Sequence, residues 1–421
     1  MGGSTTTYPG FPVPNPTTSY WQLPPHRIAN HRTTPNLPTT TTFDYIIIGS
    51  GISGAATAYK LLRRNPSTSI LMLEARSAAS GASGRNGGHC RAGWWTNFKK
   101  YAEAFGEEEA LKFEALEEGN VRDIAAFVRE HEVECDFRAV ETADLAATEA
   151  VWEEAMEVVR FREDVRRRRP DAGDLSSERK FWVGEEARER FGIEALVGAI
   201  TYPGHTQNPY RLVCRMLELS LDMGLNLQTN TLVTDVSPST TPDGARQWNV
   251  RTERGTAQGR QVVLATNAYT NALHRSLGAT GFLTPSRSQV TALRPGSNAT
   301  GNPALRGSAG IDDFEAGGYF FAREPGLQGE GDIIWGGGRP VSKTREMGIT
   351  DDSTVHAGIA EYLHHAPGHL FGEKAWGTEG EVLRDWTGIV CYTPDTFPLV
   401  GEAPGEEGLW MSVAMNGHGS K

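Results

Sequence analysis

Hydrophobic residues first fall into a regular pattern about a tenth of the way along the chain. Residues 43–48 form a short, mostly apolar run rich in β-branched side chains, which is typical of a buried parallel strand. Ala55, Ala58 and Leu62 then recur at helical spacing, and residues 70–73 form a second apolar run. The pattern predicts two parallel strands joined by a crossover helix.

The rest of the chain alternates between helical and strand-like patterns. Residues 102–170 place an apolar residue at every third or fourth position among Glu, Arg and Ala, which predicts helices, and residues 210–223 predict another amphipathic helix. The run Arg166–Arg169 reads as a solvated helix end or, as the alternative, an anion-binding patch. Strands are predicted in four further segments: residues 225–236, 248–266, 286–340 and 382–413.

Residues 1–42 differ from everything that follows. They are rich in Thr and Pro and contain no acidic residue. Because proline cannot continue a helix or a sheet ladder, we expect an irregular lead. Its apolar residues, among them Trp21 and Ile28, predict that part of it lies pinned across the folded domain. An amphipathic transit helix is the alternative, and the prolines argue against it.

Length and charge narrow the class of protein. A chain of 421 residues predicts two or three domains, or two interleaved ones. Its formal net charge of −11 argues against general nucleic-acid binding, and no apolar run is long enough to predict a membrane span. Four widely spaced cysteines without a CxxC pair, and no secretory signal, predict free thiols and a cytoplasmic protein.

A glycine-rich turn, Gly49-Ser50-Gly51-Ile52-Ser53-Gly54, connects the first predicted strand to its helix. In a dinucleotide-binding turn, Gly49 permits the tight bend, Gly51 lets the pyrophosphate approach the backbone, and Gly54 lets helix and strand pack closely. Glu74 ends the next strand, where a carboxylate binds a ribose diol. The alternatives are a glycine turn without a ligand and an ordinary surface acid at Glu74.

A second glycine-rich segment decides between two dinucleotides. Residues 77–89 are small, polar and dense in glycine, so this loop can wrap a large planar cofactor closely. Proteins that bind NAD do not usually need such a loop here. The sequence therefore favours FAD.

These motifs resemble a known family. The segments DYIIIGSGISGAATAYKLL and LEARSAASGASGRNGGHCRAG resemble the FAD-dependent amine oxidoreductases of the D-amino-acid oxidase (DAO) type. The nearest branch is the γ-glutamylputrescine-oxidase-like one, whose fungal members share the lead PNPTTSYW. The resemblance continues in order through VVLATNAYT, PSRSQV, GGYFF and WTGIVCYTPDTFPLVGEAPGEEGLWMSVAMNGHG.

The resemblance implies a mixed α/β (α+β) fold. A Rossmann-like FAD-binding domain is interleaved with an antiparallel-sheet substrate-binding domain, in the glutathione-reductase-2 arrangement. We expect the lead at residues 1–42, the FAD-binding domain at 43–100, 195–285 and 376–421, and the substrate domain at 101–194 and 286–375.

The resemblance also implies a set of cofactor-binding residues. Carried over by position, these are Gly49, Gly51, Ser53, Gly54, Glu74 and Arg76 for the ADP part; Ser83, Arg85, Asn86, Gly87, Gly88 and His89 along the pyrophosphate and isoalloxazine; Val233 at the adenine; Ala265 and Thr266 near the ribityl chain or pyrophosphate; and Asp395, Pro398, Gly417, His418 and Gly419 over the ring and ribityl chain.

The reaction implied is removal of a hydride from the carbon next to an amine, on an amino acid or polyamine-type substrate. The imine then hydrolyses, oxygen or another acceptor reoxidises the flavin, and no protein base is strictly needed. An arginine suits a substrate carboxylate, with surface salt bridges as the alternative role, and aromatic side chains suit an amine, with core packing as the alternative. The substrate-binding candidates are Arg91, Arg323, Arg339, Trp94, Trp95 and Tyr319.

Two further groups of residues concern covalent attachment of the cofactor and metal binding. Covalent attachment of FAD through His89 or Cys391 is an alternative to the non-covalent binding expected from the nearest branch. His364, His365 and His369 cluster in sequence, but no Cys, Asp or Glu completes a ligand set, so a helix end is expected and no metal.

The sequence departs from the family pattern in two places. It stops just after the NGHG motif, where relatives continue with a helix, and no lysine stands near Ile334, where some relatives place one for oxygen. These departures keep two alternatives open: a truncated flavin-binding paralogue without turnover, and a 2-hydroxy-acid dehydrogenase of the same fold.

Overall fold

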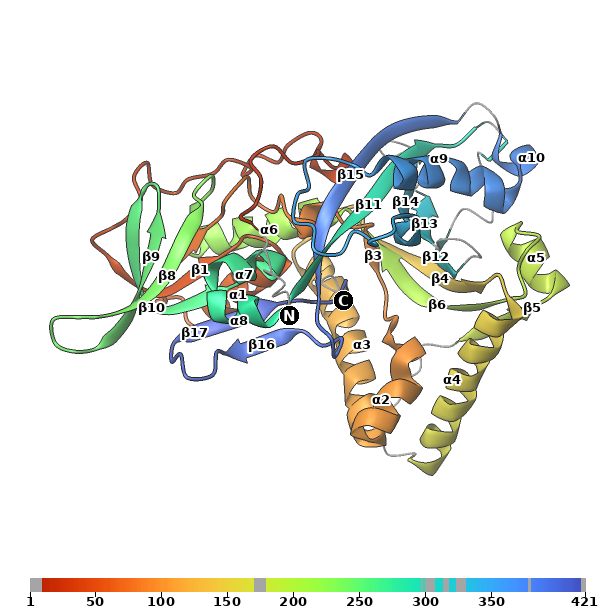
Figure 1. Ribbon diagram of the computed structural model, residues 1–421, viewed down its shortest axis with the longest axis horizontal. Coiled ribbons are helices and arrows are strands. Elements are labelled where there is room, and N and C mark those ends of the chain that lie inside the picture. Colours follow the sequence, from red (N-terminus) through yellow and green to blue (C-terminus); the bar gives the residue numbers. More distant parts are fainter. Residues whose placement is uncertain are drawn as a thin grey trace, which may run out of the picture.

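The computed structural model consists of two β-sheets that lie side by side, with helices packed against them (Figure 1). It describes residues 10–169, 179–296, 298–299, 307–312, 318–322, 331–377 and 380–417.

The first sheet has eight strands in the described chain, and its centre is parallel. Its order is β16 (Leu399–Glu402), β17 (Leu409–Val413), β10 (Gly255–Leu264), β1 (Thr42–Ile48), β2 (Ile70–Leu73) and β7 (Asn226–Gln228), with β9 (Arg246–Thr252) and β8 (Val233–Thr240) extending from β10. Helices α1 (Ile52–Arg64) and α6 (Pro209–Asp222) bury their apolar faces in one core with β1 and β2. The predicted strand–helix–strand unit and the later helix are confirmed.

The second sheet has nine strands in the described chain and is mainly antiparallel. Its order is β15 (Glu381–Tyr392), β11 (Thr284–Arg294), β14 (Ile333–Gly337), β13 (Gly318–Ala322), β12 (Ser308–Asp312), β4 (Arg138–Ala146), β6 (Gly198–Thr206) and β3 (His89–Cys90), with β5 (Lys180–Val183) beside β6. Helix α9 (Ala357–Phe371) covers its core, where Phe320 and Trp335 stack. The mixed α/β fold is confirmed.

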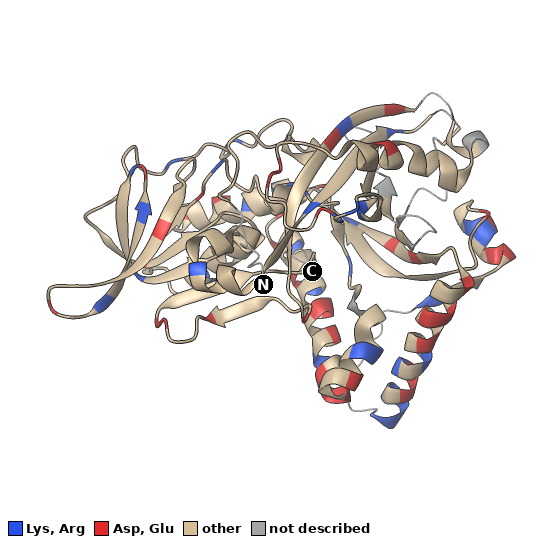
Figure 2. Ribbon diagram, viewed as in Figure 1, with Lys and Arg blue, Asp and Glu red and all other residues tan. Residues whose placement is uncertain are grey.

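Three helices project from the second sheet: α2 (Phe98–Phe105), α3 (Glu107–Glu130) and α4 (Glu149–Arg168). Acidic and basic residues alternate along α3 and α4 (Figure 2). The helical prediction for residues 102–170 missed β4 between them, because pairing with β6 and β12 outweighs local composition. Arg168, near the end of α4, pairs with Glu107 and Asp164, which fits a solvated helix end.

The remaining elements are short helices and 3₁₀ turns that connect the strands. They are α5 (Glu185–Phe191), α7 (Thr270–Leu273), α8 (Arg275–Thr280), α10 (Glu373–Trp376), η1 (Tyr20–Gln22), η2 (Ala82–Gly84), η3 (Trp94–Asn97), η4 (Asn267–Tyr269) and η6 (Arg339–Val341). In the part of the chain that the structure describes, no helix combines the length and apolarity of a membrane span.

The chain alternates between the two sheets. It leaves the first sheet after β2 and again after β10, and it returns after β6 and after β15. β3, β6 and β15 belong to the second sheet, although the sequence-based boundaries assign their segments to the FAD-binding domain. The boundaries came from the family resemblance and remain a prediction, whereas sheet membership depends on hydrogen-bond partners distant in sequence.

The lead runs over the first sheet as an irregular segment that is bonded at several points. Trp21 and Ile28 are buried, Thr33 N–H donates to the Leu227 carbonyl, and Arg32 donates to the carbonyl groups of Thr229 and Asn230. The expectation that part of the lead is pinned to the domain is therefore confirmed.

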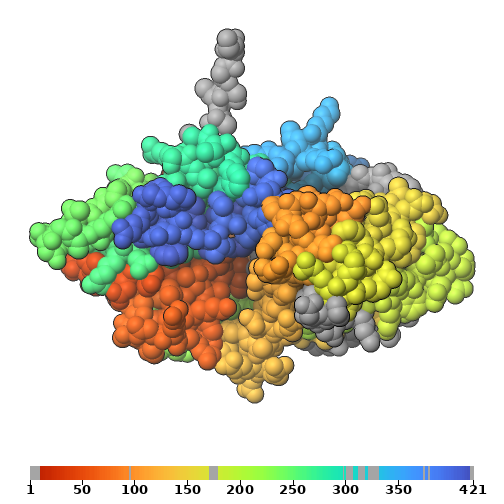
Figure 3. Space-filling model, turned by 90° about the horizontal axis from the view of Figure 1, so that it is seen from below, coloured from red at the N-terminus to blue at the C-terminus, as the bar shows by residue number. Residues whose placement is uncertain are grey.

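The segment between β15 and β17 lies against α2 and α3, as Figure 3 shows from below. There Phe397 contacts the rings of Tyr101, Phe105 and Phe113 at centroid distances of 4.8–5.4 Å. This aromatic cluster joins the first sheet to the projecting helices.

Candidate active site

A cavity of about 660 Å³ lies between the two sheets. Its wall combines the ends of β1 and β2, the loop after β2, strands β11, β13, β14 and β15, and two residues of the lead, Phe11 and Pro12. Its volume lies in the range of about 300–1,000 Å³ typical of small-molecule and cofactor sites.

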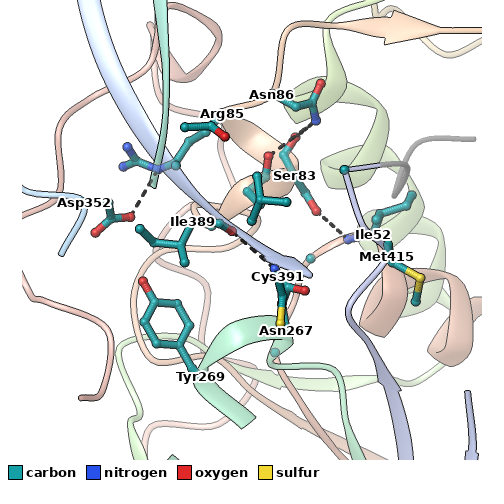
Figure 4. Close-up of a pocket in the computed structure, with 18 of the residues that line it drawn as sticks. Ile52, Ser83, Arg85, Asn86, Asn267, Tyr269, Asp352, Ile389, Cys391 and Met415 are labelled. Atoms are coloured by element: carbon teal, nitrogen blue, oxygen red, sulfur yellow. Dashed lines mark hydrogen bonds and ion pairs between the residues drawn. The ribbon is translucent and has the colours of Figure 1, made fainter. Parts of the chain in front are cut away.

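The turn after β1 has no room for side chains at two of its glycines. Gly49 has a φ of 105°, and a Cβ there would lie 2.6 Å from the Ala265 carbonyl oxygen. A Cβ on Gly54 would collide with the Gly49 carbonyl oxygen, so only glycine lets α1 start this close to the strand. The N–H of Ile52, the first residue of α1, donates to Ser83 Oγ at 2.8 Å (Figure 4).

Glu74 is fixed at the end of β2 and faces the cavity. Its carboxylate accepts hydrogen bonds from the N–H and hydroxyl of Ser50, at 3.0 and 2.6 Å, and from Arg76 N–H at 2.9 Å. These donors hold the carboxylate in one place, which is compatible with the ribose-binding role that the sequence predicts for it. This end of the cavity, around Glu74 and Arg76, is called the adenosine end below, after that predicted role.

A buried cluster of charges stands beside Glu74. The Arg76 guanidinium binds the Asp352 carboxylate at 2.9 and 3.1 Å, and Arg85 Nε lies 3.9 Å from the same carboxylate (Figure 4). Burial lowers the pKa of Arg85 to about 10, whereas the Asp352 carboxylate outweighs burial and raises the pKa of Arg76. Both arginines therefore remain protonated at neutral pH, and the Asp352 carboxylate faces the two of them at once.

Most of the predicted cofactor residues line this one cavity. They are Gly49, Gly51, Ser53, Glu74, Arg76, Ser83, Arg85, Asn86, Gly87, His89, Val233, Ala265, Thr266 and Gly417. Gly54 and Gly88 shape the backbone without lining it, and Asp395 and Pro398 are absent from the wall. Asp395 instead accepts a bond from Phe397 N–H within its own turn. His418 and Gly419 lie outside the described residues.

The other end of the cavity is formed by Tyr319 and Arg339 and is called the substrate end below. The Tyr319 ring fits between Gly87 and Gly336, where any Cβ would collide with it. The Arg339 guanidinium lies 5.1 Å from the centre of the Tyr392 ring and donates to Ser286 Oγ at 3.3 Å. Among the described residues, no carboxylate lies within 4 Å of Arg339, and the Tyr319 hydroxyl has no hydrogen-bond partner. Burial raises the pKa of Tyr319 to about 12, so its hydroxyl stays protonated.

Arg91 also reaches the cavity, but its charge is already balanced. Its Nη1 donates to Asp144 at 2.9 Å and to the Tyr202 hydroxyl at 3.2 Å. Burial alone would lower the pKa of Arg91, and the charge of Asp144 raises it above its usual value instead. Of the three predicted arginines, Arg323 lies outside the described residues, as do the side chains of Trp94 and Trp95.

The two residues weighed for covalent attachment both line the cavity. The His89 ring meets the Tyr319 ring edge to face at 5.4 Å, and Cys391 is fully buried. Burial raises the pKa of the Cys391 thiol to about 12. The histidine cluster of the sequence, His364, His365 and His369, lies on α9. His364 Nε2 lies 3.0 Å from the Asp385 carboxylate.

Sequence reasoning missed several residues of the wall. They include Phe11, Pro12, Asn267, Tyr269, Leu273, Asp352, Tyr392, Met415 and Asn416. Most stand in loops or at strand ends without a repeating pattern. Asn267 and Tyr269 lay within the quoted VVLATNAYT motif, which was the one signal for them.

Fold and cavity together define a dinucleotide-binding protein whose second, antiparallel sheet closes the site. The family model of the FAD-dependent oxidoreductases, DAO, matches residues 44–421. The chain belongs to this family. Its glycine turn, the Glu74 carboxylate and the second glycine-rich loop fit an FAD, because together they offer room and polar groups along one continuous cavity.

Three known proteins are similar to this chain. The probable oxidoreductase OrdL of Haemophilus influenzae is 23% identical over 64% of this chain, and the match spans 60% of that protein's length. The glycine oxidase of Geobacillus kaustophilus has a TM-score of 0.66 at 21% identity, covering 90% of this chain and 92% of that one. The L-amino acid deaminase of Proteus myxofaciens has a TM-score of 0.70 at 16% identity, covering 99% and 93%.

Proposed function

We propose that this protein oxidises an amino acid at the carbon that carries the amine, with FAD as the hydride acceptor. The observation that carries the proposal is the position of Arg339. It is a cation in the cavity wall, and the described residues supply no carboxylate to balance it. A planar guanidinium can bind a substrate carboxylate through two parallel hydrogen bonds.

The charges around the cavity favour an amino acid over a polyamine. The acids among the described lining residues are Glu74 and Asp352, and both are bonded at the adenosine end. The substrate end presents Arg339 and two tyrosines, Tyr319 and Tyr392. A second ammonium group would find no partner there, whereas a carboxylate would.

Each residue at the substrate end can take part in positioning. Arg339 would hold the carboxylate, and the protonated Tyr319 hydroxyl would donate a further bond. Gly87 touches the Tyr319 ring, so a substrate bound there lies against the second glycine-rich loop. FAD, when bound, supplies the hydride acceptor, and the neutral amine of the substrate makes a separate protein base unnecessary.

We propose that FAD is held without a covalent bond. The Cys391 thiol is a poor nucleophile, because burial raises its pKa to about 12 and little thiolate exists at neutral pH. Acid precipitation of the purified protein should therefore leave the flavin in the supernatant. Colour that stays in the pellet would point to attachment, and a His89→Ala variant would test the alternative link.

The function is tested by anaerobic reduction of the purified yellow protein. Amino acids should bleach the oxidised flavin spectrum, and 2-hydroxy acids and polyamines should not. Bleaching by γ-glutamylated polyamines, which also carry a carboxylate, would place the protein in the γ-glutamylputrescine-oxidase-like branch. Bleaching by hydroxy acids alone, or by no compound, would contradict the proposal. Readmission of air or of a dye then identifies the electron acceptor.

A further inference from the structure

Two residues of the lead bind the second glycine-rich loop from its outer side. Ser19 Oγ donates to the Gly84 carbonyl at 2.6 Å, and the Trp21 indole N–H donates to the Asn86 carbonyl at 2.8 Å. Between them, Trp386 of β15 donates to the Arg85 carbonyl at 2.7 Å. All three donors come from side chains that are almost fully buried.

These bonds fix the direction of the loop's peptide planes. In a trans peptide the N–H of one residue points opposite to the carbonyl of the residue before it. The Trp386 and Trp21 bonds therefore turn the N–H groups of Asn86 and Gly87 away from the two indoles. Asn86 and Gly87 line the cavity, whereas neither tryptophan does. Among the described residues, neither N–H has a hydrogen-bond partner.

The lead also touches the adenosine end of the same cavity. Phe11 and Pro12 form part of the wall, and the next residue, Val13, accepts a bond from Arg76 through its carbonyl. Further along, Thr17 Oγ1 accepts from Arg85 and lies within bonding distance of the Asp352 carbonyl. One short segment thus contacts the cavity near Arg76 and also at the loop.

We propose that the lead is part of the cofactor site, and that Ser19 and Trp21 are positioning residues. Trp21 holds the N–H of Gly87 toward the cavity as a donor for a bound flavin, beside the Asn86 N–H that Trp386 holds, and Ser19 fixes the preceding turn of the loop through the Gly84 carbonyl. Pre-set donors bind a ligand more tightly than donors that must first be ordered. The lead therefore raises FAD affinity, beyond any contribution to the fold.

The test compares Trp21→Phe with Tyr20→Phe. The first variant removes the indole donor to the loop and keeps an aromatic ring. The second removes a bond of similar length in the same 3₁₀ turn, from the Tyr20 hydroxyl to Asp332 at 2.7 Å, which does not reach the loop. FAD is stripped from each holoprotein, and its dissociation constant on rebinding is measured by flavin fluorescence.

The expected result is an increase of about tenfold in the FAD dissociation constant for Trp21→Phe, with little change for Tyr20→Phe. Replacing the buried Trp21 indole also costs packing, so the dissociation constants are compared well below the melting temperatures of both apoproteins. Equal dissociation constants would overturn the proposal. Ser19→Ala, which removes the lead's bond to the Gly84 carbonyl, tests the lead's hold on the same loop by the same measurement if Trp21→Phe does not fold.

This inference depends on flavin binding and not on the substrate. A protein that binds flavin but is reduced by no amino acid would contradict the proposed function and leave the comparison of dissociation constants decisive. A wild-type chain that binds no flavin would overturn both.

Discussion

The two ends of the cavity differ in whether the protein itself supplies partners for their polar groups. At the adenosine end, Glu74 and Asp352 are bonded by donors from the protein itself. At the substrate end, the described structure gives Arg339 no carboxylate partner and the Tyr319 hydroxyl no hydrogen bond. Since unpaired buried polar groups cost free energy, those that persist are candidates for binding a ligand. The difference separates groups that the protein itself bonds from groups that are available to a ligand.

The largest expected effect is at the adenosine end. Asp352→Ala leaves the buried guanidinium groups of Arg76 and Arg85 without their shared partner. We expect the free energy of unfolding to fall by about 3–5 kcal/mol, measured by urea denaturation. Asp385→Ala is the matched control, because the His364–Asp385 pair is partly exposed and should lose less than about 1 kcal/mol. Equal losses of unfolding free energy in the two variants would show that Asp352 has no special structural role.

The next effect is on catalysis at the substrate end. Arg339→Met should lower kcat/KM for the best amino acid about a hundredfold, since it removes the carboxylate's partner, while stability and FAD content stay near wild type. Arg339→Lys keeps the charge without the planar fork, so its kcat/KM should lie between those of wild type and Arg339→Met. A stability loss as large as that of Asp352→Ala would mean that Arg339 is a structural cation after all.

The smallest effect concerns a hydroxyl. Tyr319→Phe should raise the KM for the amino acid about tenfold and leave FAD affinity unchanged, because only one hydrogen bond to substrate is lost. Burial raises the pKa of Tyr319 to about 12, so the neutral phenol should persist up to about pH 11. Wild-type KM should therefore show no tyrosinate-linked increase between pH 8 and pH 10. An increase that disappears in Tyr319→Phe would show that this hydroxyl ionises lower than its burial implies.

The same contrast explains what sequence reasoning could reach. Apart from Asp352, the adenosine end is mostly local: the glycine turn, its strand and helix, and Glu74 lie within about thirty residues, and the turn requires glycine for reasons of backbone geometry. The substrate end is assembled from β13, η6 and β15, which are far apart in sequence. The sequence made Arg91 and Arg339 equal candidates for binding a substrate carboxylate. The Asp144 partner of Arg91 could not be predicted, because it lies on β4, a strand in a segment whose composition predicts helix.

Asp352 shows the limit most clearly. It stands in a polar loop without any periodic pattern, and no motif includes it. Its importance comes from the two arginines, Arg76 and Arg85, that the fold brings to it from more than 260 residues away. Similarly, Trp21 and Ile28 predicted from sequence that the lead is anchored. Only the folded chain shows that hydrogen bonds from the lead end on the second glycine-rich loop.

The chain's repeated passage between the two sheets limits how this protein can change over time. No single break divides it into a cofactor half and a substrate half, because each sheet is collected from separated stretches. A single recombination point therefore cannot exchange one sheet and leave the other intact. Replacing individual side chains on β13, β14 and η6 is the direct way to alter one wall of the cavity while the first sheet stays in place.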